Sequence, residues 1–158
     1  MSREEHDPTQ ARPEDAQHTL HGSCLCKSFR FELRGPVRFL KNCHCSRCRK
    51  MTGGAFATYA RARADALHVL SGRDALTLYE RQPGNFIAFC RICGSLVPYP
   101  PPGSLEVEFL AGLLDDDPGL KVSFEIYVGS RASWSRLDEG VPQFDEQTTG
   151  AASRVPGT

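Results

Sequence analysis

The stretch 42–50 holds three cysteines within six residues: Cys43, Cys45 and Cys48. Side chains alternate along an extended segment, so Cys43 and Cys45 should project to one side and His44 to the other. A turn or short helix beginning at Ser46, a residue type suited to capping, would carry Cys48 back towards the first two sulfurs. Catalytic zinc sites commonly use three protein ligands and leave a position for water or substrate. The stretch therefore predicts an open zinc site with the three cysteines as its catalytic residues.

The other four cysteines form two pairs, Cys24 with Cys26 and Cys90 with Cys93. Together they supply four thiolates, the ligand set of a closed structural zinc site. Spacing alone leaves other groupings open, such as the two Cys-x-Cys pairs together. A redox-active dithiol at 90–93 is a competing interpretation, but the βαβ setting of such sites is missing. Buried, reduced cysteines packing as small apolar side chains are a further alternative.

Basic residues flank the central stretch, and Arg47, Arg49 and Lys50 are the candidates for binding a cofactor or an anionic substrate. Cations beside thiols lower the thiol pKa values, and an arginine can contact a carboxylate through two hydrogen bonds. For any one of these residues alone, a solvated turn is the simpler interpretation. His44 is expected to pack or to support a ligand rather than bind metal. Trp134 is expected in the core.

The composition favours one domain that works in a reducing compartment. The 158 residues carry 19 lysines plus arginines and 19 aspartates plus glutamates, so no global field attracts nucleic acid or an anionic membrane. No apolar run approaches the roughly 18 residues that span a bilayer, and the polar start is not that of a signal peptide. Seven cysteines, an odd number in close pairs, favour metal over disulfides. The sequence thus predicts a cytoplasmic protein that binds no membrane.

Short alternating segments predict a mainly β fold of antiparallel strands with one or two helical turns. Polar, proline-containing residues predict a disordered tail at 1–17 and a flexible tail at 148–158, which leaves a single domain at 18–147. Helical turns are expected at Ser46 to Thr52, ended by Gly53, and near 64–67 and 112–116. The expected strands are 29–33, 37–40, 55–60, 68–70, 76–79, 86–89, 96–99, 105–109 and 122–128.

Several motifs together resemble one known family. In chain order they are Gly22-Ser-Cys24-Leu-Cys26, Cys43-His-Cys45-Ser-Arg-Cys48-Arg-Lys50 with Gly53, Phe89-Cys90-Arg-Ile-Cys93-Gly94-Ser95, Ser130-x-Ala132-Ser-Trp134 and Pro142-x-Phe144. This pattern resembles the glutathione-dependent formaldehyde-activating enzymes and their relatives, which include centromere protein V. The resemblance extends from Leu20 to Phe144.

The resemblance implies small antiparallel sheets around zinc, in the β-tent or Mss4-like architecture. It implies two zinc ions per chain: a structural one held by the four paired cysteines and a labile catalytic one held by Cys43, Cys45 and Cys48. The implied activity is that of a carbon-sulfur lyase, which joins formaldehyde to the thiol of glutathione to give S-hydroxymethylglutathione, or cleaves it. The alternative is a non-enzymatic zinc module that binds a partner or nucleic acid.

Two residues depart from the family pattern. Lys27 follows the first Cys-x-Cys where many members have glycine, which predicts a differently shaped turn. Glu125 stands where the family often has histidine. Neither departure removes a cysteine.

Overall fold

The computed structural model of the chain describes residues 19–146. The tails predicted at 1–17 and 148–158 lie outside the described residues. The described part is mainly β, with small sheets and one short α-helix, as the sequence predicts. None of its helices has the length and apolar run needed to cross a membrane.

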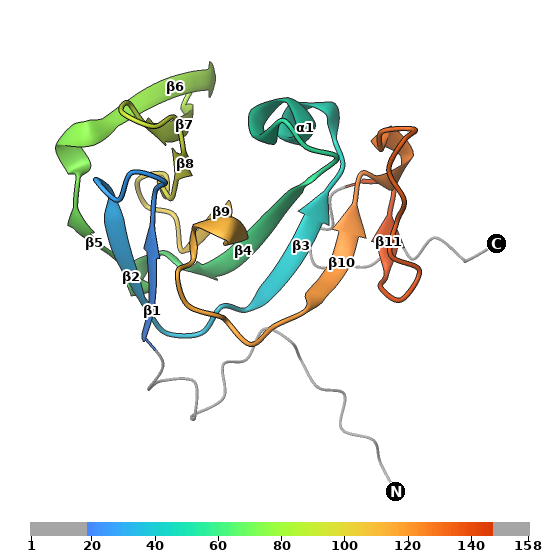
Figure 1. Cartoon of the computed structure of the whole chain (residues 1–158), viewed down its shortest axis with the longest axis horizontal. Coiled ribbons are helices and arrows are strands. Elements are labelled where there is room, and N and C mark those ends of the chain that lie inside the picture. The colour runs from blue at the N-terminus through green and yellow to red at the C-terminus, as the bar shows by residue number, and fades with distance from the viewer. Residues whose placement is uncertain (1–18, 147–158) are drawn as a thin grey trace, which may run out of the picture.

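Three sheets make up the described part (Figure 1). One has the strand order β1-β2-β5, one has the order β11-β10-β3-β4-β9, and one has the order β6-β7-β8. The strands are β1 (Thr19–Ser23), β2 (Arg30–Arg34), β3 (Phe39–Cys43), β4 (Ala57–Arg63), β5 (Leu67–Ser71), β6 (Leu76–Gln82), β7 (Asn85–Cys90), β8 (Leu96–Val97), β9 (Glu106–Leu110), β10 (Val122–Ile126) and β11 (Gln143–Phe144). Figure 1 shows the β6-β7-β8 sheet at the upper left, across from helix α1 (Ser46–Thr52).

Pairing is antiparallel within the two three-stranded sheets and along β3, β4 and β9. Strand β10 differs from the predicted antiparallel pattern, because it runs parallel to both β3 and β11. Strand β10 thereby pairs with β3 from Leu40 to Cys43 and places Ile126 opposite Cys43. Strands β1 and β11, which the sequence pattern did not predict, lie at the edges of their sheets.

The main hydrophobic core lies between the sheets. Phe29, Phe31 and Leu33 are fully buried on and beside β2, and the ring of Phe31 meets that of Phe109 from β9 edge to face at 5.6 Å. Gly22 on β1 lies against Phe31, so closely that a Cβ there would be 2.2 Å from the ring. A smaller cluster around Cys43, Ala57, Ile126 and Phe144 packs beneath the central cysteines. The first cysteine of the central stretch is therefore part of a packed core.

Helix α1 follows β3 after two residues. It begins at Ser46, as predicted, but its N-cap is Cys45, whose Sγ accepts a hydrogen bond from the backbone N of Cys48. Gly53 ends the helix in the left-handed conformation, with φ of 67°. Short 3-10 turns lie at Ala64–Ala66, Arg73–Ala75, Ala111–Leu113 and Val128–Ser130. The expectation that Trp134 packs in the core is wrong, because its side chain is 72% exposed.

Candidate metal centre and active site

The three central cysteines meet where β3 passes into α1. Cys43 ends β3 and is 4% exposed, Cys45 caps the helix, and Cys48 lies buried in the first helical turn. Their three Sγ atoms all lie within 4.8 Å of one another, so this thiol trio could hold a metal ion. The neighbouring His44 is fully buried and lies outside this group, as alternation along the strand predicts.

The thiol trio lines an open hollow of about 540 Å³. Two polar side chains that the sequence did not single out also line it, Tyr59 from β4 and Arg81 from β6. The Tyr59 hydroxyl lies 3.5 Å from the Sγ of Cys48. The buried Nε of Arg81 has no hydrogen-bond partner among the described residues. Tyr59 lies 11 residues after Cys48 and Arg81 lies further along the chain, and only the sheet arrangement brings both to the hollow.

Within the trio, the thiol pKa values of Cys43 and Cys48 shift in opposite directions. The hydrogen bond between Cys48 and Cys43 lowers the pKa of the Cys48 thiol to about 6, and hydrogen bonds with Tyr59 and Cys45 add to the effect. The same bond and burial raise the pKa of Cys43, and burial together with Cys48 raises that of Tyr59. These contacts favour the deprotonated form of Cys48, and a deprotonated sulfur is what metal coordination requires.

The second cluster joins two separate sheets. Cys24 and Cys26 follow β1, whereas Cys90 ends β7 and Cys93 lies in the turn before β8. Their four Sγ atoms lie within 4.8 Å of one another, with Cys26 3.6 Å from Cys24 and 3.8 Å from Cys90. We call them the four-thiol cluster. The grouping of four plus three is thus the one that the fold brings together, and it replaces the alternative of pairing the two Cys-x-Cys segments.

The spacing of these sulfurs fits zinc. A tetrahedral site with Zn–S bonds of about 2.3 Å has sulfurs about 3.8 Å apart, close to the distances within the four-thiol cluster. Polar groups surround the sulfurs: the backbone N of Phe29 donates to Cys24, and the hydroxyl of Ser95 lies 3.4 Å from Cys93. Hydrogen bonds from Ser95 lower the pKa of Cys93 to about 5, while burial raises that of Cys24 to about 11. Both clusters could therefore hold metal ions of the kind that thiolates prefer.

The predicted cations take different positions. Arg47 is exposed and lines the hollow beside the trio. Arg49 points the other way, and its guanidinium donates to the backbone oxygens of His44 and Ser130, at 3.3 Å each. Lys50 is exposed on α1 and is not among the residues that line the hollow. Arg47 alone of the three lies beside the thiol trio's open side.

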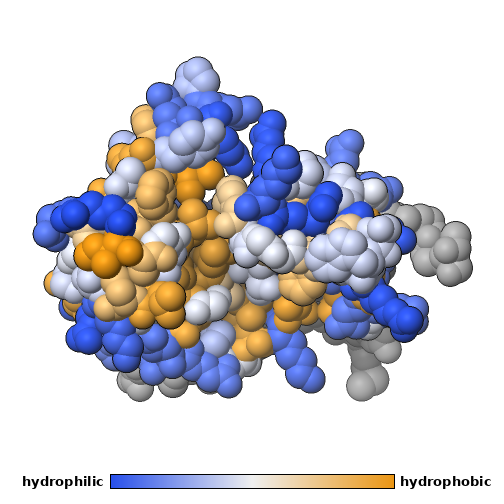
Figure 2. All heavy atoms as spheres, turned by 45° about the horizontal axis from the view of Figure 1, so that its top comes forward, coloured by the Kyte–Doolittle hydropathy of each residue, from blue (hydrophilic) through white to orange (hydrophobic). Residues whose placement is uncertain are grey.

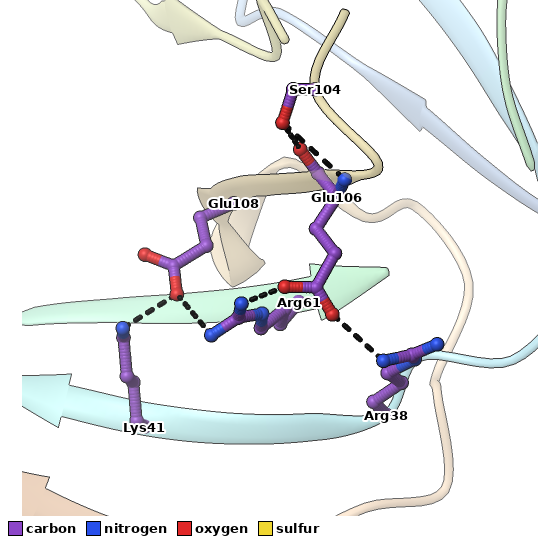
Figure 3. A network of polar contacts seen from close by, with 6 residues as sticks. All are labelled: Arg38, Lys41, Arg61, Ser104, Glu106 and Glu108. Atoms are coloured by element: carbon purple, nitrogen blue, oxygen red, sulfur yellow. Dashed lines mark hydrogen bonds and ion pairs between the residues drawn. The ribbon is translucent and has the colours of Figure 1, made fainter. Parts of the chain in front are cut away.

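An ion-pair network runs across β3, β4 and β9 beside the hollow (Figure 3). Lys41, which lines the hollow, is 4% exposed, and its Nζ lies 2.6 Å from Glu108. Figure 3 shows the chain of contacts continuing from Glu108 through Arg61 and Glu106 to Arg38. Lys41 therefore has a carboxylate partner already, whereas Arg81 lacks one among the ion pairs of residues 19–146.

Buried polar side chains form a cluster beside Cys43, at the end of β3. His44 is fully buried and its Nε2 lies 3.4 Å from Oε1 of Glu125, which is 2% exposed. The same carboxylate oxygen accepts a hydrogen bond from the Asn42 amide at 3.2 Å, and Asn42 accepts one from Thr58 at 2.8 Å. The departure at Glu125 thus supplies an acceptor to β3, beside Cys43.

The departure at Lys27 leaves the backbone of the turn in a left-handed conformation. Lys27 has φ of 61°, and its N–H donates to the oxygen of Cys24 at 2.8 Å. The turn therefore adopts the left-handed conformation although its residue is not glycine, and the lysine carries a steric cost that glycine would avoid.

Comparison with known proteins agrees with this arrangement. Residues 19–130 match the family described as glutathione-dependent formaldehyde-activating enzyme. Among solved structures, the crystal structure of a Rhodobacter sphaeroides protein is 28% identical with a TM-score of 0.50, covering 61% of this chain and 89% of that chain. No curated protein matches. The family match spans both cysteine clusters, and the chain therefore belongs to the family of glutathione-dependent formaldehyde-activating enzymes.

Proposed function

We propose that the protein is a zinc-dependent carbon-sulfur lyase acting on the adduct of an aldehyde with glutathione or a similar thiol, as an S-(hydroxymethyl)glutathione synthase does. Cys43, Cys45 and Cys48 are its catalytic metal ligands, and the four-thiol cluster holds a structural ion. The observation that carries the proposal is the position of the thiol trio on the wall of an open hollow. Family membership supports the glutathione-related substrate class.

The charges around the hollow suit the carboxylates of a glutathione-like molecule. Arg81 and Arg47 reach it from β6 and α1, and neither guanidinium forms an ion pair within residues 19–146. A guanidinium presents two parallel donors to a carboxylate. A partly buried arginine with an unpartnered Nε gains more from such a contact than a fully solvated one. We assign Arg81 and Arg47 to substrate binding, with Arg81 as the stronger contact.

The reaction itself needs one proton to move. A carbon-sulfur bond forms between the thiol and the aldehyde carbon, the S–H proton is lost, and the carbonyl oxygen gains a proton to become the hydroxyl. A zinc ion held by Cys43, Cys45 and Cys48 would supply a Lewis acid suited to a thiolate ligand. The Tyr59 hydroxyl lies on the hollow beside Cys48 and is the group of this chain suited to hold or deliver that proton.

The test separates metal loss from proton transfer with two variants. Cys48→Ala should lose one of two metal equivalents and all catalysed adduct exchange while keeping the fold, as measured by metal analysis, NMR exchange between glutathione and formaldehyde, and circular dichroism. Tyr59→Phe should keep both metal equivalents and lose about a hundredfold of the rate, roughly the lower end of the range for general acid catalysis. Two zinc ions per chain in Cys48→Ala, or wild-type exchange no faster than uncatalysed addition, would refute the proposal.

A further inference from the structure

The hollow of the thiol trio continues into an apolar groove. The groove has a volume of about 400 Å³ and is lined by five apolar or aromatic side chains and two arginines: Met51, Tyr79, Ile87, Phe89, Leu96, Arg47 and Arg81. The two arginines also line the hollow of the trio, so the two spaces share these side chains as walls. Figure 2 shows hydrophobic surface gathered in the recess between the two sides of the molecule.

Strand register explains why one wall of this groove is apolar. Tyr79 on β6 is the cross-strand partner of Ile87 on β7, and Phe89 on β7 is the partner of Leu96 on β8. Side chains two residues apart on a strand share a face, so these four residues form one face of the β6-β7-β8 sheet. None of the four side chains is buried, and Tyr79 is 59% exposed. This sheet face is therefore accessible from the groove.

Helix α1 supplies the opposite wall. Arg47 and Met51 are four residues apart on the helix and project from the same side. The helix thus presents a cation near the thiol trio and an apolar side chain one turn further along. A third, smaller space of about 130 Å³ connects the two regions, because Tyr59 lines it together with Met51 and Ile87. The groove is an extension of the trio's own site.

A formaldehyde adduct would leave this groove empty. Its hydroxymethyl group is small and polar, and it offers no apolar surface to Ile87, Phe89 or Leu96. Resting on the proposed function, we propose that the groove binds an apolar chain on the aldehyde-derived carbon. The preferred substrates are then adducts of glutathione with apolar aldehydes of several carbons. The addition balances as for formaldehyde, with the carbon-sulfur bond formed at the aldehyde carbon and the proton passed to its oxygen.

The experiment is a calorimetric titration of the zinc-loaded protein with glutathione and with S-methyl-, S-butyl- and S-hexylglutathione. Each added methylene should tighten binding about threefold to fourfold until the groove is filled. In Ile87→Ser the gain in binding per methylene should shrink, because a polar hydroxyl replaces the apolar side chain in the groove wall. Leu78→Ser is the matched control: Leu78 is 44% exposed on β6 but lies on the other face and does not line the groove, so the dependence should persist.

The outcomes separate the groove from the proposed function. Glutathione binding without any gain along the alkyl series overturns the groove and leaves the proposed function standing. If glutathione does not bind, the proposed function fails, and a comparison of hexane-1-thiol with ethanethiol decides whether the groove still selects apolar thiols. A wild-type dimer that becomes a monomer in Ile87→Ser, measured by sedimentation, would assign the groove to a second copy of the chain and overturn the inference.

Discussion

Single residues around the two clusters carry strain or buried charge that nearby groups must balance. Lys27 adopts φ of 61° one residue after a ligand of the four-thiol cluster. Glu125 is buried beside His44 and is the acceptor for Asn42. The lysine has a conformational cost, whereas the carboxylate accepts a hydrogen bond from a buried amide, so substitutions of the two residues should act in opposite directions on stability.

Lys27→Gly should raise the free energy of unfolding by about 1 kcal/mol, because glycine has no Cβ to clash in the left-handed region. Lys27→Ala is the control, since alanine keeps the Cβ and removes only the exposed charge. Urea denaturation of the zinc-loaded protein measures both. Equal stabilisation by glycine and alanine would show that the lysine charge, not the backbone, is responsible.

Glu125→Leu should lower the free energy of unfolding by about 2 kcal/mol, because the buried Asn42 amide loses its acceptor. Glu125→Gln keeps a carbonyl oxygen at that position and should cost less than half as much. The same denaturation experiment compares the two variants. A leucine variant as stable as the wild type would mean that the carboxylate contributes no net stability to β3.

Helix α1 is the element on which the candidate active site depends most. It carries Cys48 inward, Arg47 to the hollow and Met51 to the groove, although it has only seven residues. A helix this short is not stable by itself and relies on its caps and on packing. The caps are Cys45 at the start and Gly53 at the end.

Gly53→Ala should lower the free energy of unfolding by about 1 kcal/mol, because φ at this position is 67° even though a Cβ would meet no neighbouring atom. Gly54→Ala is the matched control, since Gly54 has no positive φ and its Cβ would make ordinary contacts at 3.5 Å. That change should stay within about 0.5 kcal/mol. Equal losses in the two variants would contradict the assigned role of Gly53 as the helix C-cap.

At the scale of the whole molecule, the four-thiol cluster connects the β1-β2-β5 sheet to the β6-β7-β8 sheet. Cys26 and Cys90 are 64 residues apart in sequence and 3.8 Å apart at their sulfurs. An ion held there would close a long loop and contribute its binding free energy directly to folding. The cysteines of the thiol trio, in contrast, come from one continuous stretch of chain, so an ion there would stabilise only the connection between β3 and α1.

Cys93→Ser should therefore lower the free energy of unfolding by about 3 kcal/mol or more. Cys48→Ala should cost less than half of that, because the segments around the trio are already joined by strand pairing. Thermal unfolding of each variant, with metal analysis beforehand, makes the comparison. A larger loss in Cys48→Ala than in Cys93→Ser would reverse the structural and catalytic assignments of the clusters.

The sequence predicted those parts of the site in which local spacing determines geometry. Cys43, Cys45 and Cys48 converge because a strand end and one helical turn are sufficient to bring them together. Tyr59 and Arg81 could not be predicted, since they reach the hollow only through the arrangement of β4 and β6. The parallel pairing of β10 with β3 was missed because alternation does not encode strand direction. Trp134 was placed in the core from its residue type alone, without a pattern of neighbours to support it.

The sulfur of Cys45 has two tasks, because it belongs to the thiol trio and also accepts the hydrogen bond that starts α1. Anything that consumes this sulfur, such as oxidation or alkylation, removes the helix cap in the same event. The loosened helix would carry Met51 away from the sheet, and the groove would lose one wall. Chemical damage at this single atom would therefore remove one of the trio's sulfurs and one wall of the groove in the same event.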